Sequence, residues 1–157
     1  MSHKVCFIGH RQFLPPWLAE QLKRTVEETI KNGCQYFTMG THGDFDRLAL
    51  AVCRQLKSQY PTLKIEVILT NPPPPTDSIM QPNQDIETIM YEIETLHPKQ
   101  RIWFSNQKMV ENCDTLICYA DNNWHLTSGT HKVVKYALKR GLQIINLADY
   151  SRVNSST

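Results

Sequence analysis

The sequence has no apolar run long enough to cross a bilayer and no large excess of charge of either sign. A membrane span needs about 20 consecutive apolar residues, and no such run occurs among the 157 residues. The formal net charge is only +2, which is small for a broad surface that binds nucleic-acid phosphates. The N-terminus lacks the apolar segment and cleavage site of a signal peptide. These absences predict a cytoplasmic protein with no membrane partner, and they make nucleic acid a less favoured partner.

The five cysteines form no Cys-x-x-Cys pair, and the chain has no internal repeat. Cys6 and Cys118 fall in short apolar runs, and Cys53 lies in a helical pattern. This distribution predicts buried free thiols rather than disulfides or a zinc site. Four histidines and two aspartates occur in three polar segments, 9–11, 40–46 and 121–131, but without the spacing of a metal site, so we expect neither a metal nor another cofactor. These residues are His10, His42, Asp44, Asp121, His125 and His131.

Short apolar runs alternate with amphipathic segments along most of the chain. The runs that predict strands are 5–8, 36–39, 65–69, 115–119 and 143–147. The segments that predict helices are 16–32, one that begins at 43 or 44, 83–96, 105–112 and 130–140. Residues 71–76 contain four consecutive prolines and predict an extended surface loop, whereas residues 101–104 predict a short strand or a loop.

This alternation predicts a Rossmann-like three-layer α/β sandwich around a central, mostly parallel five-stranded sheet. A single domain is expected over residues 1–150, followed by a polar tail at 151–157. Such sheets bind ligands beyond the carboxyl ends of their strands, where the strand order reverses. The loops after the first, second and fourth expected strands therefore share one crevice. They contain residues 9–11, 40–46 and 121–131.

A turn of small and hydroxyl-bearing residues precedes the last expected helix. Ser128, Gly129 and Thr130 lie between a strand and that helix. The first backbone N–H groups of a helix lack internal partners and carry partial positive charge, so this turn can hold a phosphate. An ordinary helix N-cap explains the same residues without a ligand. Because three polar loops converge on one crevice, the phosphate site is the favoured interpretation.

Charged and imidazole side chains in these loops are further candidates. Arg11 can bind a phosphate, or it can form a salt bridge with Asp44 or Asp46. Asp46 can hold a ribose hydroxyl or fix Arg11, although a carboxylate in the first turn of a helix is favourable without either role. His10 is expected to organise its loop through hydrogen bonds rather than to act as a base.

Glycine and aromatic residues complete the candidate ligand site. Gly9, Gly40 and Gly43 permit either tight turns or the close approach of a ligand. Trp124 can stack on a base or pack over the edge of the sheet, and the same two roles are open to Trp103. Neither choice is decided by the sequence.

Four motifs occur in order along residues 4–148. The first is Ile8-Gly9-His10-Arg11, and the second is Gly43-Asp44-Phe45-Asp46. Residues 106–117, Asn-Gln-Lys-Met-Val-Glu-Asn-Cys-Asp-Thr-Leu-Ile, lead into the fourth expected strand, and Ser128-Gly129-Thr130 precedes Tyr136-Ala137. Together these motifs resemble the SLOG family, the Rossmann-like superfamily shared by the DprA and LOG proteins, in its small stand-alone bacterial form. The second motif has one residue more, and the last has one glycine fewer, than the family pattern.

The resemblance implies that the ligand is a nucleotide or a derivative of one. LOG proteins hydrolyse the N-glycosidic bond of nucleoside monophosphates with a glutamate that registers here on Val133. Because valine cannot accept a proton, we expect a module that senses or sequesters its ligand rather than a LOG-like phosphoribohydrolase. DprA relatives bind single-stranded DNA, which is the weaker alternative.

Two further expectations are less direct. A hydrolase of a nucleotide glycosidic or phosphate bond would need another carboxylate, from Asp46, Glu87, Glu92 or Asp121. The relatives commonly pair through helices beside the site, so the resemblance also implies a homodimer. Apolar residues in the segment 79–96 can supply the dimer face, although packing on the sheet explains them equally well.

Overall fold

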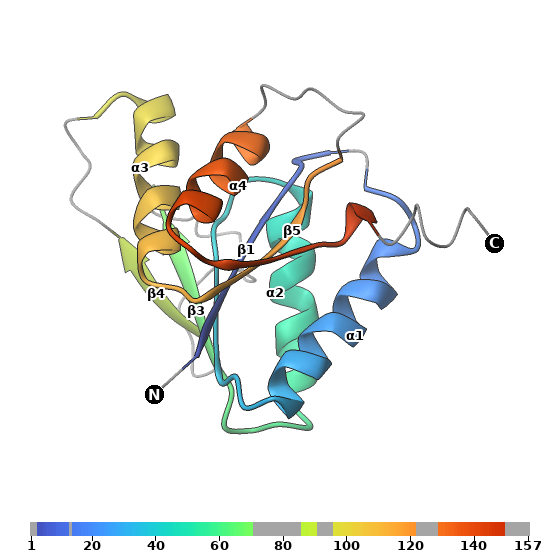
Figure 1. Cartoon of the computed structure of the whole chain (residues 1–157). Helices are drawn as coiled ribbons and strands as arrows, with labels where there is room; N and C mark the ends of the chain where they lie inside the picture. The colour runs from blue at the N-terminus through green and yellow to red at the C-terminus, as the bar shows by residue number, and fades with distance from the viewer. Residues whose placement is uncertain (1–2, 13, 71–85, 91–95, 122–128, 150–157) are drawn as a thin grey trace.

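The computed structural model describes residues 3–12, 14–70, 86–90, 96–121 and 129–149 (Figure 1). Within these residues the strands are β1 (Lys4–Gly9), β2 (Tyr36–Met39), β3 (Lys64–Leu69), β4 (Ile86–Met90), β5 (Thr115–Tyr119) and β6 (Gln143–Asn146). The helices are α1 (Leu18–Lys31), α2 (Asp44–Lys57), α3 (Pro98–Glu111) and α4 (Gly129–Lys139).

The six strands form one sheet in the order β4-β3-β2-β1-β5-β6, and every neighbouring pair is parallel. The chain builds outward from β1 to β4 on one side and then returns to place β5 on the other side of β1. The strand order therefore reverses between β1 and β5. The register pairs Gly9 with Tyr119 at the carboxyl ends of these two strands. This is the position at which parallel α/β sheets bind ligands.

Helices cover both faces of the sheet, with α1 and α2 on one side and α3 and α4 on the other (Figure 1). The core on the α1/α2 side contains Phe7 and Phe37, whose ring centroids lie 6.1 Å apart. The core on the other side contains Met109 and Val133. All five cysteines are buried and free, as the sequence predicts. Among the described residues, no helix is both long and apolar enough to span a membrane.

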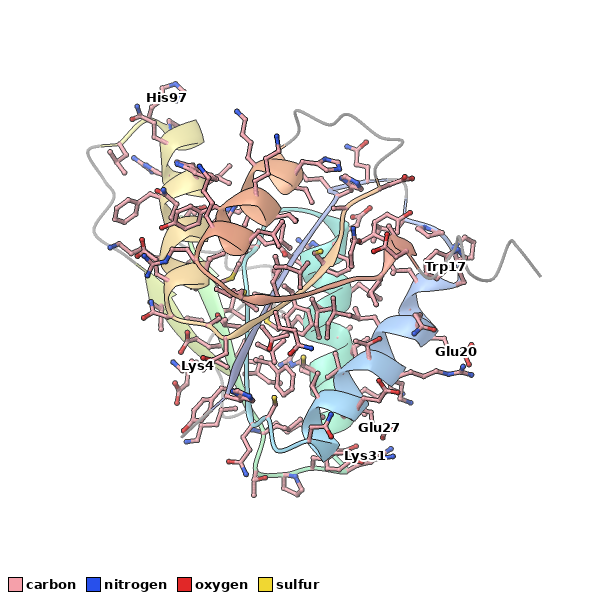
Figure 2. The ribbon with its side chains drawn as sticks, viewed as in Figure 1. Lys4, Trp17, Glu20, Glu27, Lys31 and His97 are labelled. Carbon is pink, nitrogen blue, oxygen red and sulfur yellow. The ribbon has the colours of Figure 1, made fainter. Side chains whose placement is uncertain are left out.

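The helix α1 shows how the amphipathic pattern works. Leu18, Leu22 and Val26 recur every four residues and are fully buried against the sheet. Figure 2 shows Glu20 and Glu27 on the outer side of the same helix. The pattern thus orients α1 on the sheet and leaves its charged side chains in water.

The sheet has six strands rather than the five that the sequence predicts, because β4 replaces part of the helix expected at 83–96. Ile86, Ile89 and Met90 have helical spacing, but Ile86-Glu87-Thr88-Ile89 is rich in β-branched residues. Backbone pairing with five residues of β3 decides the outcome. Parts of the proposed dimer face therefore lie in the sheet, and the homodimer stays a prediction.

The helix α3 is longer than the sequence predicts. It begins at Pro98, so it includes residues 101–104, for which the sequence predicts a short strand or a loop. Proline is favourable in the first turn of a helix because no backbone N–H is needed there. The earlier start carries Ile102 and Trp103 to the end of the sheet at which β1 and β5 terminate. Figure 2 shows His97, just before α3, at the opposite end of the molecule from Lys4 in β1.

Candidate functional site

A pocket of about 330 Å³ opens at the carboxyl end of β1, where the strand order reverses. It is formed by the loop after β1, the start of α2, the middle of α3 and the N-terminus of α4. Six residues of the predicted ligand site line it: Gly9, His10, Arg11, Asp46, Gly129 and Thr130. The structure therefore brings together residues that are up to 121 positions apart in the sequence.

Two further predicted site residues within the described part of the chain, Gly40 and Gly43, do not line this pocket. Gly40 and Gly43 lie behind it, where they pack against Asp46 and Arg11. Trp124 and Ser128 fall outside the described residues, as does the proline-rich segment 71–76.

The pocket is also lined by residues that were not named as candidate ligand-binding residues, although His42 belongs to the loop 40–46 that the sequence places in the crevice. These are Ile8, Gln12, His42, Ile102 and Asn106. Asn106 belongs to the third motif, whose residues carry no direct signal for a ligand. Ile102 lies in the segment 101–104, which the sequence predicts as a short strand or a loop but which is helical. Among the described residues, no three His, Cys, Asp or Glu side chains come together as a metal site would require.

Gly9 allows α2 to pack against the end of β1. A Cβ atom at this position would overlap the ring of Phe45, which is buried in the first turn of α2. The ring thus occupies the space that any other side chain at position 9 would need. This contact fixes the N-terminus of α2, and with it Asp46, beside the first strand.

Gly43 plays a similar role for Arg11. Its φ of +112° lies in a region that favours glycine, and a Cβ there would come within 2.6 Å of the Cα of Arg11. The backbone N–H of Asp44 also donates a 2.9 Å hydrogen bond to the carbonyl of Arg11. The start of α2 therefore holds the backbone of Arg11 at the edge of the pocket.

The guanidinium of Arg11 has no carboxylate partner among the described residues, because none of their salt bridges includes it. It is exposed at the rim of the pocket. Its charge nevertheless acts on the interior: it adds to the burial that lowers the pKa of His42, and it opposes the burial that raises the pKa of Asp46. The salt bridges from Arg11 to Asp44 or Asp46 that the sequence left open do not form.

Asp46 is the carboxylate of the pocket, and it is buried. Its Oδ2 accepts a 2.8 Å hydrogen bond from the backbone N–H of His42. Burial raises the pKa of Asp46 to about 6, although this hydrogen bond and the charge of Arg11 act in the opposite direction. Gly40 leaves room for this carboxylate, since a Cβ there would lie 3.2 Å from Oδ2.

His42 and His10 tie the loops around the pocket together. Nε2 of His42 lies 3.1 Å from the hydroxyl of Thr70, at the end of β3. Burial, followed by the charge of Arg11, lowers the pKa of His42, so its ring is neutral near pH 7. Nε2 of His10 accepts a 3.0 Å hydrogen bond from the backbone N–H of Asp121, at the end of β5. His10 is buried and organises its loop, as the sequence predicts.

The N-terminus of α4 has open space beside Gly129. A Cβ at Gly129 would meet no described atom within 4 Å. The backbone N–H groups at the start of this helix have no intrahelical partners. Gly129 and Thr130 line the pocket together with Arg11, so the helix presents to it donors without intrahelical partners and a partial positive charge.

No protein-family model and no curated protein match this sequence. The structure is similar to that of DNA processing protein A (DprA) from Helicobacter pylori, with a TM-score of 0.64 and 20% sequence identity. The similarity covers 90% of this chain but 63% of the DprA chain, so this chain spans less than two thirds of that protein. At this identity the comparison establishes the fold alone, and it confirms the Rossmann-like α/β architecture.

Proposed function

We propose that the pocket binds one nucleotide unit through its phosphate, which lies between Arg11 and the N-terminus of α4. The observation that carries this proposal is the position of Arg11, a cation with no carboxylate partner among the described residues. It shares the pocket with Gly129 and Thr130, whose backbone donors suit an anion. The volume of about 330 Å³ is in the usual range for small ligands. We also propose that the chain is a small SLOG-type protein.

The positions of the candidate catalytic residues favour binding of the ligand without its hydrolysis. Val133, at the register of the LOG glutamate, is 1% exposed and packs in the core under α3 and α4. Of the alternatives considered for a hydrolase, Glu87 lies on β4 and Asp121 does not line the pocket. Glu92 falls outside the described residues. Among the described carboxylates considered for a hydrolase, only Asp46 lines the pocket, so a hydrolase that uses one of them would depend on Asp46.

Single-stranded nucleic acid is the second candidate ligand. The H. pylori DprA structure is described as revealing a single-stranded DNA binding mode. That comparison supports a strand more directly than it supports a free nucleotide. The phosphate site proposed here would then hold one phosphate of the strand.

Thermal denaturation in the presence of single ligands tests the proposal. A ligand that binds only the native protein must raise the melting temperature. We expect stabilisation by adenosine monophosphate, NAD, ADP-ribose or a cyclic dinucleotide, and loss of that effect in Arg11→Gln. The exposed Arg24→Gln variant, far along α1, serves as the matched control. No stabilisation by any nucleotide or by a short oligonucleotide would overturn the proposal.

Two further measurements separate the candidate functions. Chromatography of each stabilising ligand shows whether it emerges intact, as expected for a binding module, or cleaved. Cleavage that Asp46→Ala abolishes, with binding retained, would instead establish a hydrolase. A steep fall in affinity with added salt, for an oligonucleotide that binds more tightly than the mononucleotide, would establish the strand as the ligand.

A further inference from the structure

We propose that the groove between α3 and α4 binds the base of the nucleotide ligand, which stacks against the ring of Trp103. The inference rests on the proposed function, because the phosphate pocket determines where the base can lie. It adds the class of group that the groove recognises, a flat aromatic ring.

The groove continues directly from the pocket. It measures about 630 Å³ and shares Arg11, Ile102, Asn106 and Gly129 with the pocket. Trp103 and Lys132 line the groove but not the pocket. A single ligand can therefore occupy both spaces, with its charged end beside Arg11 and the rest of the molecule along α3.

The two spaces differ in chemistry. The pocket is lined by imidazole, carboxylate and hydroxyl groups, including His42, Asp46 and Thr130. The groove has a mainly apolar wall, formed by Ile102 and Trp103, with a cation at its edge. A polar, anion-binding space joined to an apolar one fits a ligand that has a phosphate at one end and a flat ring at the other.

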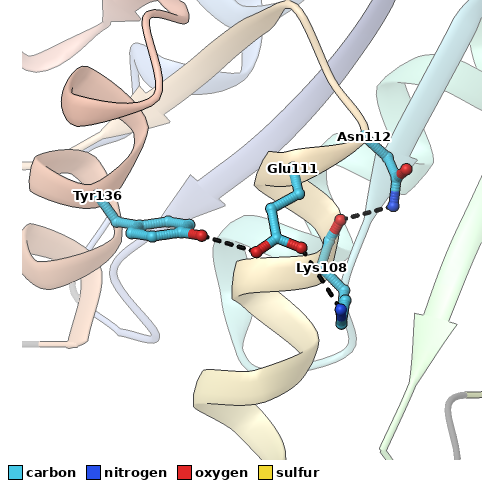
Figure 3. A network of polar contacts seen from close by, with 4 residues as sticks. All are labelled: Lys108, Glu111, Asn112 and Tyr136. Carbon is cyan, nitrogen blue, oxygen red and sulfur yellow. Dashed lines mark hydrogen bonds and ion pairs between the residues drawn. The ribbon is translucent and has the colours of Figure 1, made fainter.

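The ring of Trp103 is positioned by α4. It lies 5.9 Å from the ring of Tyr136, with an interplanar angle of 66°. The hydroxyl of Tyr136 donates a 2.8 Å hydrogen bond to Glu111, and the same carboxylate lies 3.6 Å from Nζ of Lys108 (Figure 3). Trp103 is still 37% exposed, so part of the indole is available to a ligand. A ring held in this way loses little conformational freedom when a base stacks on it.

The affinities of two probes test the inference. Adenosine 5′-monophosphate carries a base, whereas ribose 5-phosphate does not. Stacking on an aromatic side chain contributes enough that we expect Trp103→Ala to weaken monophosphate binding about 10- to 100-fold. Its affinity for ribose 5-phosphate should stay within about twofold of the wild type, and Trp103→Phe should restore most of the loss.

Trp17→Ala provides the matched control, because Trp17 is 36% exposed and lies outside the groove. The inference is overturned if Trp103→Ala weakens both probes equally, or neither. If ribose 5-phosphate itself fails to bind in an Arg11-dependent manner, the proposed function fails instead. If an adenine oligonucleotide binds more tightly than the monophosphate, and Lys132→Gln removes only that difference, the base comes from a strand. Equal binding of the two identifies a free nucleotide.

Discussion

The carboxylate of Asp46 and the backbone N–H of His42 form a 2.8 Å hydrogen bond at the bottom of the pocket. Asp46 belongs to the first turn of α2, and His42 lies in the loop just before that helix. The bond satisfies one donor of the loop, but it leaves a buried carboxylate facing the proposed phosphate site. This arrangement makes both stability and binding depend on the protonation of one group.

Asp46 should destabilise the protein as the pH rises. Its pKa is raised from 3.8 to about 6 on folding, so the folded protein holds the proton more tightly than the unfolded chain. The stabilising effect of this proton is complete below pH 3.8 and is lost as the pH rises through about 6. The total change is about 3 kcal/mol in the free energy of unfolding. Asp46→Asn keeps an oxygen acceptor for His42 and should flatten this dependence, so that the variant is more stable than the wild type near neutral pH.

Urea denaturation at several pH values between about 4 and 8 checks this expectation, since the window follows from the shift in pKa. The difference between variant and wild type should grow from about pH 4 to a little above pH 6 and then stay constant up to about pH 8. Parallel curves for the two proteins would show that Asp46 titrates normally.

Ligand affinity should also depend on this carboxylate. A charged Asp46 repels a phosphate in the same pocket, so affinity should fall as the pH rises through about 6. A phosphodiester such as cyclic adenosine monophosphate is the suitable probe, because the second ionisation of a phosphomonoester falls in the same range. Asp46→Asn should abolish the part of the pH dependence that Asp46 causes. An unchanged profile in that variant would assign the effect to the histidines.

Gly9 and Gly129 should differ in how strongly alanine at each position affects stability. At Gly9 the added Cβ overlaps the Phe45 ring, so Gly9→Ala should lower the free energy of unfolding by about 1 to 3 kcal/mol. At Gly129 the Cβ meets no described atom within 4 Å, so Gly129→Ala should change stability by less than about 1 kcal/mol. Thermal and urea denaturation of both variants measure the difference. Equal effects would mean that Phe45 does not depend on the glycine.

Thr38 should be replaceable by valine with a gain in stability. Its hydroxyl is buried in β2 and has no hydrogen-bond partner among the described residues. Thr38→Val removes an unsatisfied group of similar shape, so stability should rise by about 1 kcal/mol. Thr29→Val is the matched control, because the Thr29 hydroxyl donates a 2.7 Å hydrogen bond to the carbonyl of Val26. That variant should lose about 1 kcal/mol. A loss in both variants would indicate that Thr38 has an acceptor in solution.

The sequence correctly predicted segments whose apolar residues follow the period of a strand or of a helix, but not both. The run Val5–Ile8 and the pattern of Leu18, Leu22 and Val26 each favour one structure, and both predictions are confirmed. The region of Ile86 and Ile89 has spacing that suits a helix and composition that suits a strand. Pairing with β3 decides between them, and this contact is not visible in the sequence.

The part of the candidate site that lies at the carboxyl ends of the strands was predictable from the sheet topology. The rule that ligands bind at the carboxyl ends of parallel strands brought Arg11, Asp46 and Gly129 to one crevice. Ile102 could be placed only with the true start of α3, which depends on Pro98 in the first turn of that helix. The absence of a salt bridge between Arg11 and Asp46 could not be predicted either, because the sequence is compatible with the two side chains being paired or unpaired.

Calorimetric titration of adenosine monophosphate into the wild type, Arg11→Gln and Gly129→Ala tests the central claim most directly. The phosphate is proposed to contact the Arg11 guanidinium and the backbone beside Gly129. Each substitution should therefore weaken binding by about tenfold or more, while Arg24→Gln binds as the wild type does. Gly129→Ala is the more decisive of the two variants, because its fold should be unchanged and a loss of affinity would then come from the binding site itself. Wild-type affinity in both pocket variants would contradict a phosphate site at the N-terminus of α4.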